Sequence, residues 1–145
     1  MIAINPLHAT SVVIDGRVLL LAGASGSGKS DLALRLIDRG GVLLSDDYTQ
    51  LRAEGGLLLA SAPSTIEGRL EIRGLGIYQF QHQAVAPVAL MLDLDRPPLR
   101  LPDDPAPKTM LCGIAIPTIA FSAFECSAAI KAELALRKHG LIVER

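Results

Sequence analysis

The residues with the clearest chemical meaning form the stretch Gly23-Ala24-Ser25-Gly26-Ser27-Gly28-Lys29-Ser30. Their spacing fits G-x-x-x-x-G-K-[ST], the phosphate-binding loop (P-loop) that wraps a polyphosphate with backbone N–H groups. Its glycines let the backbone take positive φ and approach phosphate oxygens without a Cβ in the way. Lys29 would place a positive charge at the β- and γ-phosphates, and the Ser30 hydroxyl would bind Mg²⁺. The stretch therefore predicts a nucleotide site.

The segments on both sides of this loop fit the context that the motif requires. Residues 18–22 are a short apolar run, which is typical of a buried strand. Residues 31–39 consist mostly of good helix formers with an apolar face, and Gly40-Gly41 ends that helix. The positive end of the helix dipole would then point at the bound phosphates.

Two neighbouring acids, Asp46 and Asp47, follow the apolar residues 42–44. Carboxylates at the carboxyl end of a neighbouring strand can reach Mg²⁺ or the attacking nucleophile of a phosphoryl transfer. Adjacent strand residues point in opposite directions, so we expect the two acids to have different functions. Asp93 and Asp95 end another apolar run and are rival candidates for the same role.

Two further features carry weaker signals. In the stretch 70–77, Glu71 and Arg73 would share one face of a strand, where one could bind a metal and the other a phosphate. An exposed strand with an ion pair explains that pattern equally well. His8 lies just before the first expected strand, and its position alone does not assign it a function.

Turn and proline signals organise the rest of the chain. Asp15-Gly16 between apolar runs predicts a β-hairpin over residues 10–22, and a second hairpin is expected over residues 48–60. Five prolines make residues 96–108 an irregular loop, and residues 123–139 are expected to form the last helix. The apolar stripe of this helix would consist of Cys126, Ile130 and Leu134.

Composition limits the class of protein. The 145 residues are 50% hydrophobic and 20% charged, which predicts one globular domain over residues 1–145. Aromatic residues make up only 3% and the net charge is −1, so no nucleic-acid partner is expected. The start lacks a basic segment and no apolar stretch could span a membrane, so we expect a cytoplasmic protein. Cys112 and Cys126 are expected to be reduced thiols in the core.

Taken together, these stretches resemble the C-terminal catalytic domain of the HPr kinase/phosphorylase family. Leu-Glu-Ile-Arg-Gly-Leu-Gly-Ile at 70–77 is similar to the family's signature, and Arg39-Gly40 followed by an apolar strand and Asp46-Asp47 is also similar. The resemblance implies an α/β P-loop domain with a mixed sheet. It also implies an ATP- and Mg²⁺-dependent protein serine kinase that acts on an HPr-like phosphocarrier of a phosphotransferase system. Since the family is typically hexameric, a homo-oligomer is implied as well.

The resemblance also implies a role for each candidate residue. Residues 23–30 would hold the ATP phosphates, and Ser30 and Glu71 would hold Mg²⁺. Asp47 would take the proton of the substrate serine, with His8 near it and near the transferred phosphate. Arg73 would balance phosphate charge.

The chain departs from the family pattern in two respects. The family normally has an additional N-terminal domain, so a short form without regulation through that domain is expected. The family also carries a Pro-x-x-Pro-Gly-Arg run before its last helix, whereas residues 117–122 here contain no arginine. In the family this arginine favours dephosphorylation, so the phosphorylase activity would be reduced or absent unless Arg96, Arg100 or Lys108 substitutes for it.

Two other functions stay open at this stage. A small-molecule P-loop kinase would use Asp93 or Asp95 as its acidic strand end. A nucleotide-binding regulatory module would bind ATP tightly and transfer no phosphate. Substrate screening with metabolites and with a carrier protein would separate these possibilities.

Overall fold

The structure is a computed structural model that describes residues 5–143. These residues alternate short strands with two α-helices, α1 (Lys29–Asp38) and α2 (Ala128–His139), and one 3₁₀ turn, η1 (Ser64–Ile66). The strands are β1 (Ala9–Ile14), β2 (Arg17–Ala22), β3 (Val42–Ser45), β4 (Gln50–Glu54), β5 (Leu57–Ser61), β6 (Arg69–Ile72), β7 (Gly76–Gln79), β8 (Val85–Asp93), β9 (Lys108–Leu111) and β10 (Ile114–Ala120).

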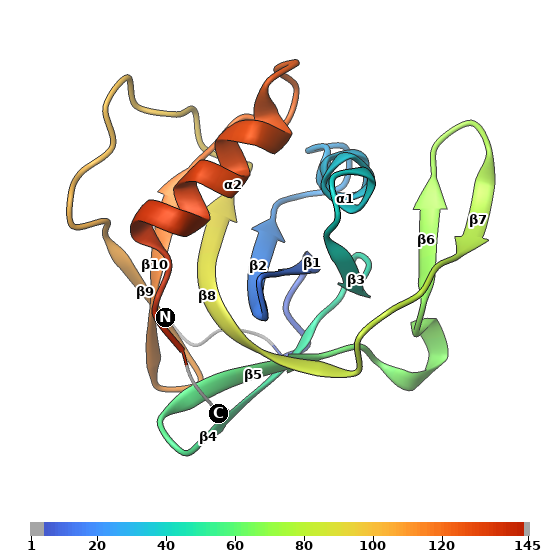
Figure 1. The fold of residues 1–145 in the computed structure, drawn as a ribbon, viewed down its shortest axis with the longest axis horizontal. Helices are drawn as coiled ribbons and strands as arrows, with labels where there is room; N and C mark the ends of the chain where they lie inside the picture. Colours follow the sequence, from blue (N-terminus) through green and yellow to red (C-terminus); the bar gives the residue numbers. More distant parts are fainter. Residues whose placement is uncertain (1–4, 144–145) are drawn as a thin grey trace.

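The central sheet has the strand order β3-β1-β2-β8-β10-β9 (Figure 1). β8 is parallel to β2 and to β10, while β1 is antiparallel to both β2 and β3. Four strands (β2, β3, β8 and β10) therefore end at one edge of the sheet, and β1 begins there. This mixed sheet confirms the α/β fold that the resemblance implied.

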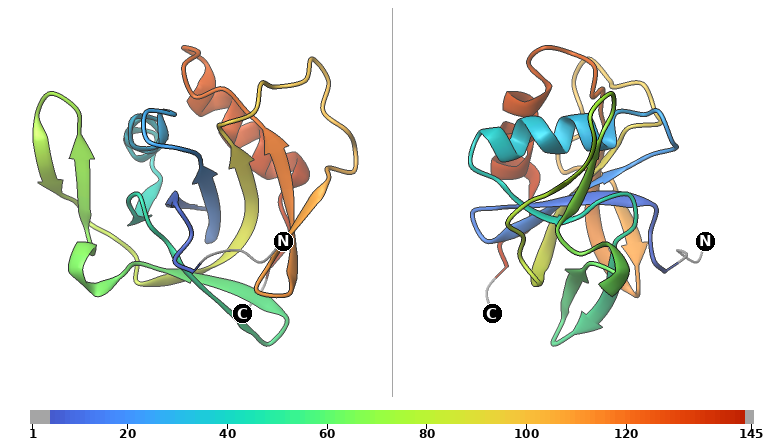
Figure 2. Two further views of the ribbon diagram at one scale, coloured as in Figure 1. Left: turned by 180° about the vertical axis from the view of Figure 1, so that it is seen from behind. Right: turned by 90° about the vertical axis from the view of Figure 1, so that its right-hand side faces the viewer.

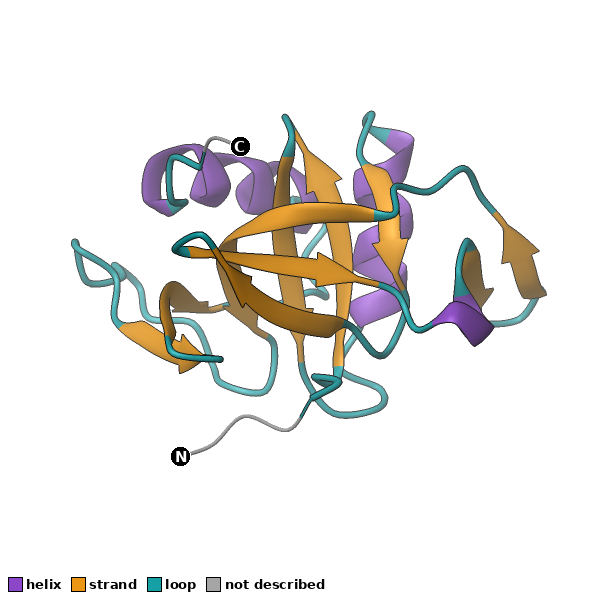
Figure 3. Cartoon of the chain, turned by 90° about the horizontal axis from the view of Figure 1, so that it is seen from below, coloured by secondary structure: helices purple, strands orange, loops and turns teal. Residues whose placement is uncertain are grey.

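Side chains of alternating direction give this sheet two apolar faces. On β2, Leu19 and Leu21 pack with the buried faces of α1 and α2, whereas Val18 and Leu20 pack with the β4–β5 hairpin. Figure 3 shows the hairpin crossing one face of the sheet, with both helices on the other. Because both faces are covered, the P-loop strand is fixed from two sides.

β8 connects the two parts of the sheet. Near its start it pairs with β5, where Ala60 lies opposite Ala86, and at its end it pairs with β2, where Ala22 lies opposite Asp93. β6 and β7 form a separate two-stranded sheet that stands beside α1, away from the central strands (Figure 2). Residues of α1 and of this second sheet line a common cavity.

The turn predictions are confirmed. Asp15 and Gly16 have φ of 52° and 76° and connect β1 to β2, as a two-residue hairpin turn requires. The second expected hairpin is β4–β5, which turns at Gly55-Gly56. The proline-rich segment between β8 and β9 contains no helix or strand.

The predictions for the last helix and the cysteines need correction. The helix begins at Ala128 rather than at 123, and Ile130 and Leu134 are 47% and 53% exposed. Cys112 and Cys126 are free thiols as expected, but both are exposed rather than in the core. The helix packs closely, so small side chains occupy its inner face. That face consists of Ala128, Ala129, Ala132 and Leu136.

No helix in the described range 5–143 is long and apolar enough to cross a membrane.

Candidate active site

The glycine-rich loop connects β2 to α1 at the edge of the sheet where the parallel strands end. Gly26 and Gly28 have φ of 86° and 95°, in the region that only glycine adopts readily. Gly28 is also the residue from which α1 starts. The strand, loop and helix predicted from the motif are therefore confirmed, and the free N–H groups of the first helical turn face the loop.

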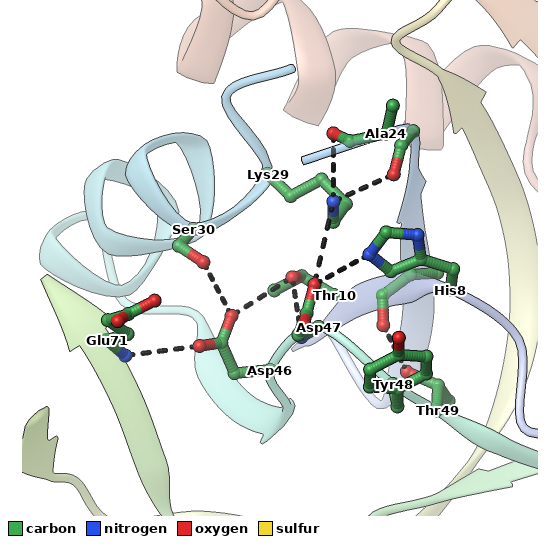
Figure 4. A network of polar contacts seen from close by, with 12 residues as sticks. His8, Thr10, Ala24, Lys29, Ser30, Asp46, Asp47, Tyr48, Thr49 and Glu71 are labelled. Atoms are coloured by element: carbon green, nitrogen blue, oxygen red, sulfur yellow. Dashed lines mark hydrogen bonds and ion pairs between the residues drawn. The ribbon is translucent and has the colours of Figure 1, made fainter. Parts of the chain in front are cut away.

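Lys29 is folded back onto the loop. Its ammonium donates hydrogen bonds to the carbonyl oxygens of Gly23 at 2.7 Å and Ala24 at 3.1 Å, and lies 3.7 Å from Asp47 Oδ1 (Figure 4). The side chain is only 5% exposed. Its charge is thus held at the centre of the loop by groups that a phosphate can replace.

Asp46 connects the loop to the strands around it. Its Oδ1 accepts hydrogen bonds from Ser30 Oγ at 2.6 Å and from Thr10 Oγ1 at 3.1 Å, and its Oδ2 accepts one from the backbone N–H of Glu71 at 3.1 Å. The residue is buried. Asp46 therefore fixes the Ser30 hydroxyl relative to β1 and β6.

Asp47 points in another direction, toward the open part of the site. Its Oδ1 accepts a hydrogen bond from His8 Nε2 at 2.8 Å, and its side chain is 51% exposed. The backbone has a φ of 68°, and its N–H donates to Thr10 Oγ1 at 3.0 Å. His8 in turn stacks on Tyr48, with ring centroids 5.0 Å apart. Asp46 and Asp47 thus have separate hydrogen-bond partners, and the different functions expected of them stay a prediction.

A cavity of about 760 Å³ opens between the loop, α1 and the β6–β7 hairpin. Glu71 and Arg73 both line it, so the signature stretch faces the glycine-rich loop across this space. His8 is not among the lining residues and reaches the site through Asp47. The lining also includes Ser25, Gly26, Gly28, Lys29, Ser30, Asp46, Asp47 and Phe124, but not Gly23, Ala24 or Ser27.

The donor atoms at this cavity suit Mg²⁺ bound together with phosphate oxygens. Ser30 offers a hydroxyl, and Asp46 and Glu71 offer carboxylates. Mg²⁺ commonly takes one or two protein carboxylates and completes its shell with water and substrate phosphates. Within residues 5–143 no cluster of three or more His, Cys, Asp or Glu side chains forms a metal cage. The residues therefore fit a metal that arrives with a nucleotide.

The rival acids have other partners. Asp93 accepts from Arg96 Nε at 2.8 Å, and Asp95 accepts from the backbone N–H of Ala24 at 3.0 and 3.1 Å. Asp95 thus holds the start of the glycine-rich loop, and neither acid lines the cavity. The geometry favours Asp46 and Asp47 as the acids of the site.

Sequence reasoning missed Thr10 and Tyr48. The Thr10 hydroxyl forms hydrogen bonds with both Asp46 and Asp47. In the sequence, however, a threonine within an apolar strand looks like an ordinary core residue. Its position follows from the pairing of β1 with β3, which places Ser11 opposite Ser45. Tyr48 directly follows the acids, and only the fold reveals its stacking on a residue 40 positions earlier.

Comparison with known proteins places these features in a family. The family model described as the HPr Serine kinase C-terminal domain matches residues 2–84. The HPr kinase/phosphorylase of Clostridium botulinum (strain Eklund 17B / Type B) is 45% identical over 71 residues, which is 49% of this chain and 23% of that protein. The HPr kinase/phosphorylase of Geobacillus thermodenitrificans is 42% identical over 97 residues, 61% of this chain and 31% of that protein. The chain thus aligns with less than a third of the length of these curated relatives.

A solved structure covers more of the chain. The structure of the Hpr(Ser) kinase/phosphatase from Coxiella burnetii matches with a TM-score of 0.76 and 33% sequence identity. The match covers 90% of this chain and 92% of that one. On the family model and this structural match together, the chain belongs to the HPr kinase/phosphorylase family and corresponds to its C-terminal domain.

Proposed function

We propose that residues 1–145 act as one catalytic domain, an ATP- and Mg²⁺-dependent kinase that phosphorylates a serine of an HPr-like phosphocarrier. The observation that carries this proposal is the position of Asp47. Its half-exposed carboxylate lies between His8 and Lys29, at a cavity that begins at the amino end of α1. A base, a cation and a phosphate-binding loop thus meet at one point.

The glycine-rich loop would take the β- and γ-phosphates of ATP. Lys29 would exchange its bonds to the Gly23 and Ala24 carbonyls for phosphate oxygens, a stronger charge-assisted contact. This exchange favours a polyanion over a neutral ligand.

Ser30 and Glu71, which both line the cavity, would hold Mg²⁺. Bound there, Mg²⁺ supplies positive charge that offsets the charge developing on the phosphate oxygens during transfer. Asp46 would orient the Ser30 hydroxyl, which already donates to it. Arg73 would lie near the outer phosphate, on the cavity wall opposite the loop.

In the transfer step, Asp47 would accept the proton of the substrate serine. The serine oxygen forms its bond to the γ-phosphorus while the bond from that phosphorus to the ADP oxygen breaks. His8 would hold the Asp47 carboxylate in position by its hydrogen bond of 2.8 Å. Catalysis of this kind consists mainly of positioning and of charge neutralisation.

The reverse reaction is expected to be reduced or absent. The family arginine is missing from residues 117–122. Among the described residues that line the cavity, Lys29 and Arg73 are the cations. Arg96, one of the possible substitutes, is paired with Asp93, and Arg100 and Lys108 are not part of the lining. Incubation of the phosphorylated carrier with inorganic phosphate tests this point by the release of pyrophosphate.

Labelled ATP, Mg²⁺ and a purified HPr-like carrier test the main proposal. Label should transfer to one serine of the carrier, located by mass spectrometry, and metal chelation should stop the transfer. Phosphorylation of a metabolite with none of the carrier would instead support a small-molecule kinase. Tight ATP binding without any transfer would support a regulatory module.

We also propose that the chain assembles as a homo-oligomer, as the family's hexamers imply. Ile130 and Leu134 are exposed one turn apart on α2, which gives that helix an apolar outer face. Sedimentation analysis of the protein, with Leu134→Glu as the disrupting variant, tests this assembly. A monomeric wild-type protein at micromolar concentration would contradict it.

A further inference from the structure

The loop between β10 and α2 carries an unusually exposed aromatic ring. Phe124 is 74% exposed, although Phe121 and Ala123 in the same loop are buried. A single exposed apolar side chain is normal on a protein surface and assigns no function by itself. What distinguishes Phe124 is that it lines the cavity that also contains Lys29, Ser30 and Asp47.

Arg35 of α1 holds this loop on both sides of the ring. Its guanidinium donates to the carbonyl oxygen of Ala123 and, at 3.1 Å, to that of Glu125. The same side chain forms an ion pair of 3.0 Å with Asp31, one turn earlier on α1. Charge-assisted bonds before and after Phe124 hold the backbone that carries its ring against α1.

The ring lies against the glycine-rich loop itself. A Cβ added at Gly28 would lie 3.3 Å from Phe124 Cε1 and 2.9 Å from the Cβ of Ala123. The missing side chain at position 28 therefore leaves room for the loop that carries Phe124. This contact places an aromatic ring next to the residue that precedes Lys29 and α1.

A nucleotide has to extend past this point. Its phosphates would occupy the loop around Lys29, and its nucleoside must then lie along another part of a cavity that suits a ligand of this size. Phe124 is the aromatic side chain among the described residues of that lining. Bases stack on aromatic rings whatever their hydrogen-bonding edge, because every base has a π-face.

We propose that Phe124 is the platform on which the base of the bound nucleoside triphosphate stacks. This proposal rests on the proposed function, since it needs a nucleotide at the glycine-rich loop. A purine offers a larger π-face for stacking than a pyrimidine, so purine nucleotides bind more tightly than pyrimidine nucleotides. Stacking alone does not read the edges of a base, so ATP and GTP bind similarly. Phe124 is in this sense the residue that determines nucleotide preference.

Equilibrium titration with two probes tests this role. One probe is Mg-ATP and the other is Mg-tripolyphosphate, which has the phosphates and no base. Phe124→Ala should weaken ATP binding on the order of tenfold, the effect expected for loss of one stacked base. Its binding of tripolyphosphate should equal that of the wild type, and its preference for ATP over CTP should disappear. Leu101→Ala, which truncates a similarly exposed apolar side chain in the proline-rich segment, is the matched control and should change neither ATP binding nor tripolyphosphate binding.

A fluorescent variant gives a second, independent readout. The chain contains no tryptophan, so Phe124→Trp introduces a single reporter at the proposed platform. ATP should quench its emission and bind at least as tightly as to the wild type, while tripolyphosphate should leave the emission unchanged. Equal responses to both probes would overturn the proposal.

The remaining outcomes are also informative. An unchanged ATP affinity in Phe124→Ala, or equal losses for ATP and tripolyphosphate, would show that the ring does not bind the base. Slower transfer to the carrier with unchanged ATP affinity would assign Phe124 to the protein substrate and overturn the stacking role. If the wild type bound neither probe, the proposed function itself would fail, and the stacking role with it.

Discussion

Asp46 and Asp47 are adjacent in the chain, yet their carboxylates bind separate partners on two sides of the site. Asp46 accepts from Ser30 Oγ at 2.6 Å, and Asp47 accepts from His8 Nε2 at 2.8 Å. Asp46 is buried and Asp47 is half exposed. Asp46 therefore fixes the Ser30 hydroxyl, and Asp47 faces the open part of the cavity.

The Thr10 hydroxyl forms hydrogen bonds with both acids, to the Asp46 carboxylate and from the Asp47 N–H. Its removal should therefore destabilise the protein. Thr10→Val keeps the shape of the side chain and leaves the Asp47 N–H without its partner at 3.0 Å. An unsatisfied buried polar group costs about 1–3 kcal/mol, so the free energy of unfolding should fall by that amount in urea denaturation. Thr10→Ser retains the hydroxyl, so its free energy of unfolding should fall much less. Equal losses in both variants would mean that packing of the methyl group, not the hydrogen bond, matters at this position.

His8 should influence transfer without influencing nucleotide binding. His8→Ala removes the hydrogen bond to the Asp47 carboxylate and should slow transfer to the carrier on the order of 10- to 100-fold, the value of one hydrogen bond to a charged group. Because His8 does not line the cavity, the ATP affinity should be retained. His139→Ala, at the far end of α2, is the control and should be neutral. A His8→Ala variant that transfers normally would remove His8 from the proposed site.

Lys29 should contribute directly to the binding of ATP. Lys29→Ala removes the ammonium from the centre of the loop and should weaken ATP binding on the order of tenfold or more, as measured by calorimetric titration. Lys138→Ala removes a 68% exposed ammonium elsewhere and should leave the affinity unchanged. Equal ATP affinities in these two variants would show that the loop does not hold the phosphates.

Much of the site's scaffold could be predicted from local sequence signals. Gly26 and Gly28 of the motif and Gly16 of the first turn are positions where positive φ is expected, and all three have it in the structure. In P-loop proteins a strand next to the loop strand commonly ends in acidic residues, and this pattern predicts a strand before Asp46 and Asp47. β3 ends directly before them. These signals are short-range, and the structure confirms each of them.

The rest depended on contacts between distant segments. Thr10 became part of the site through the register of β1 with β3, which no local pattern contains. Phe124 was hidden inside an expected helix over residues 123–139, whereas residues 121–127 form a loop fixed to α1 by Arg35. The sequence pattern predicts that the larger side chains of Cys126, Ile130 and Leu134 form the apolar stripe of the last helix. In the structure α2 packs so closely that its inner face consists mainly of alanines.

In the proposed reaction, Asp47 accepts the proton of the substrate serine while the glycine-rich loop holds ATP. The most direct measurement is the single-turnover rate of phosphoryl transfer to the carrier by Asp47→Asn at saturating ATP, with ATP affinity determined on the same sample. Asparagine tolerates the positive φ of position 47 and can keep the contact to His8, so the site should stay assembled. We expect a loss of at least about 100-fold in the transfer rate with nearly unchanged ATP affinity. Transfer at the wild-type rate would contradict it.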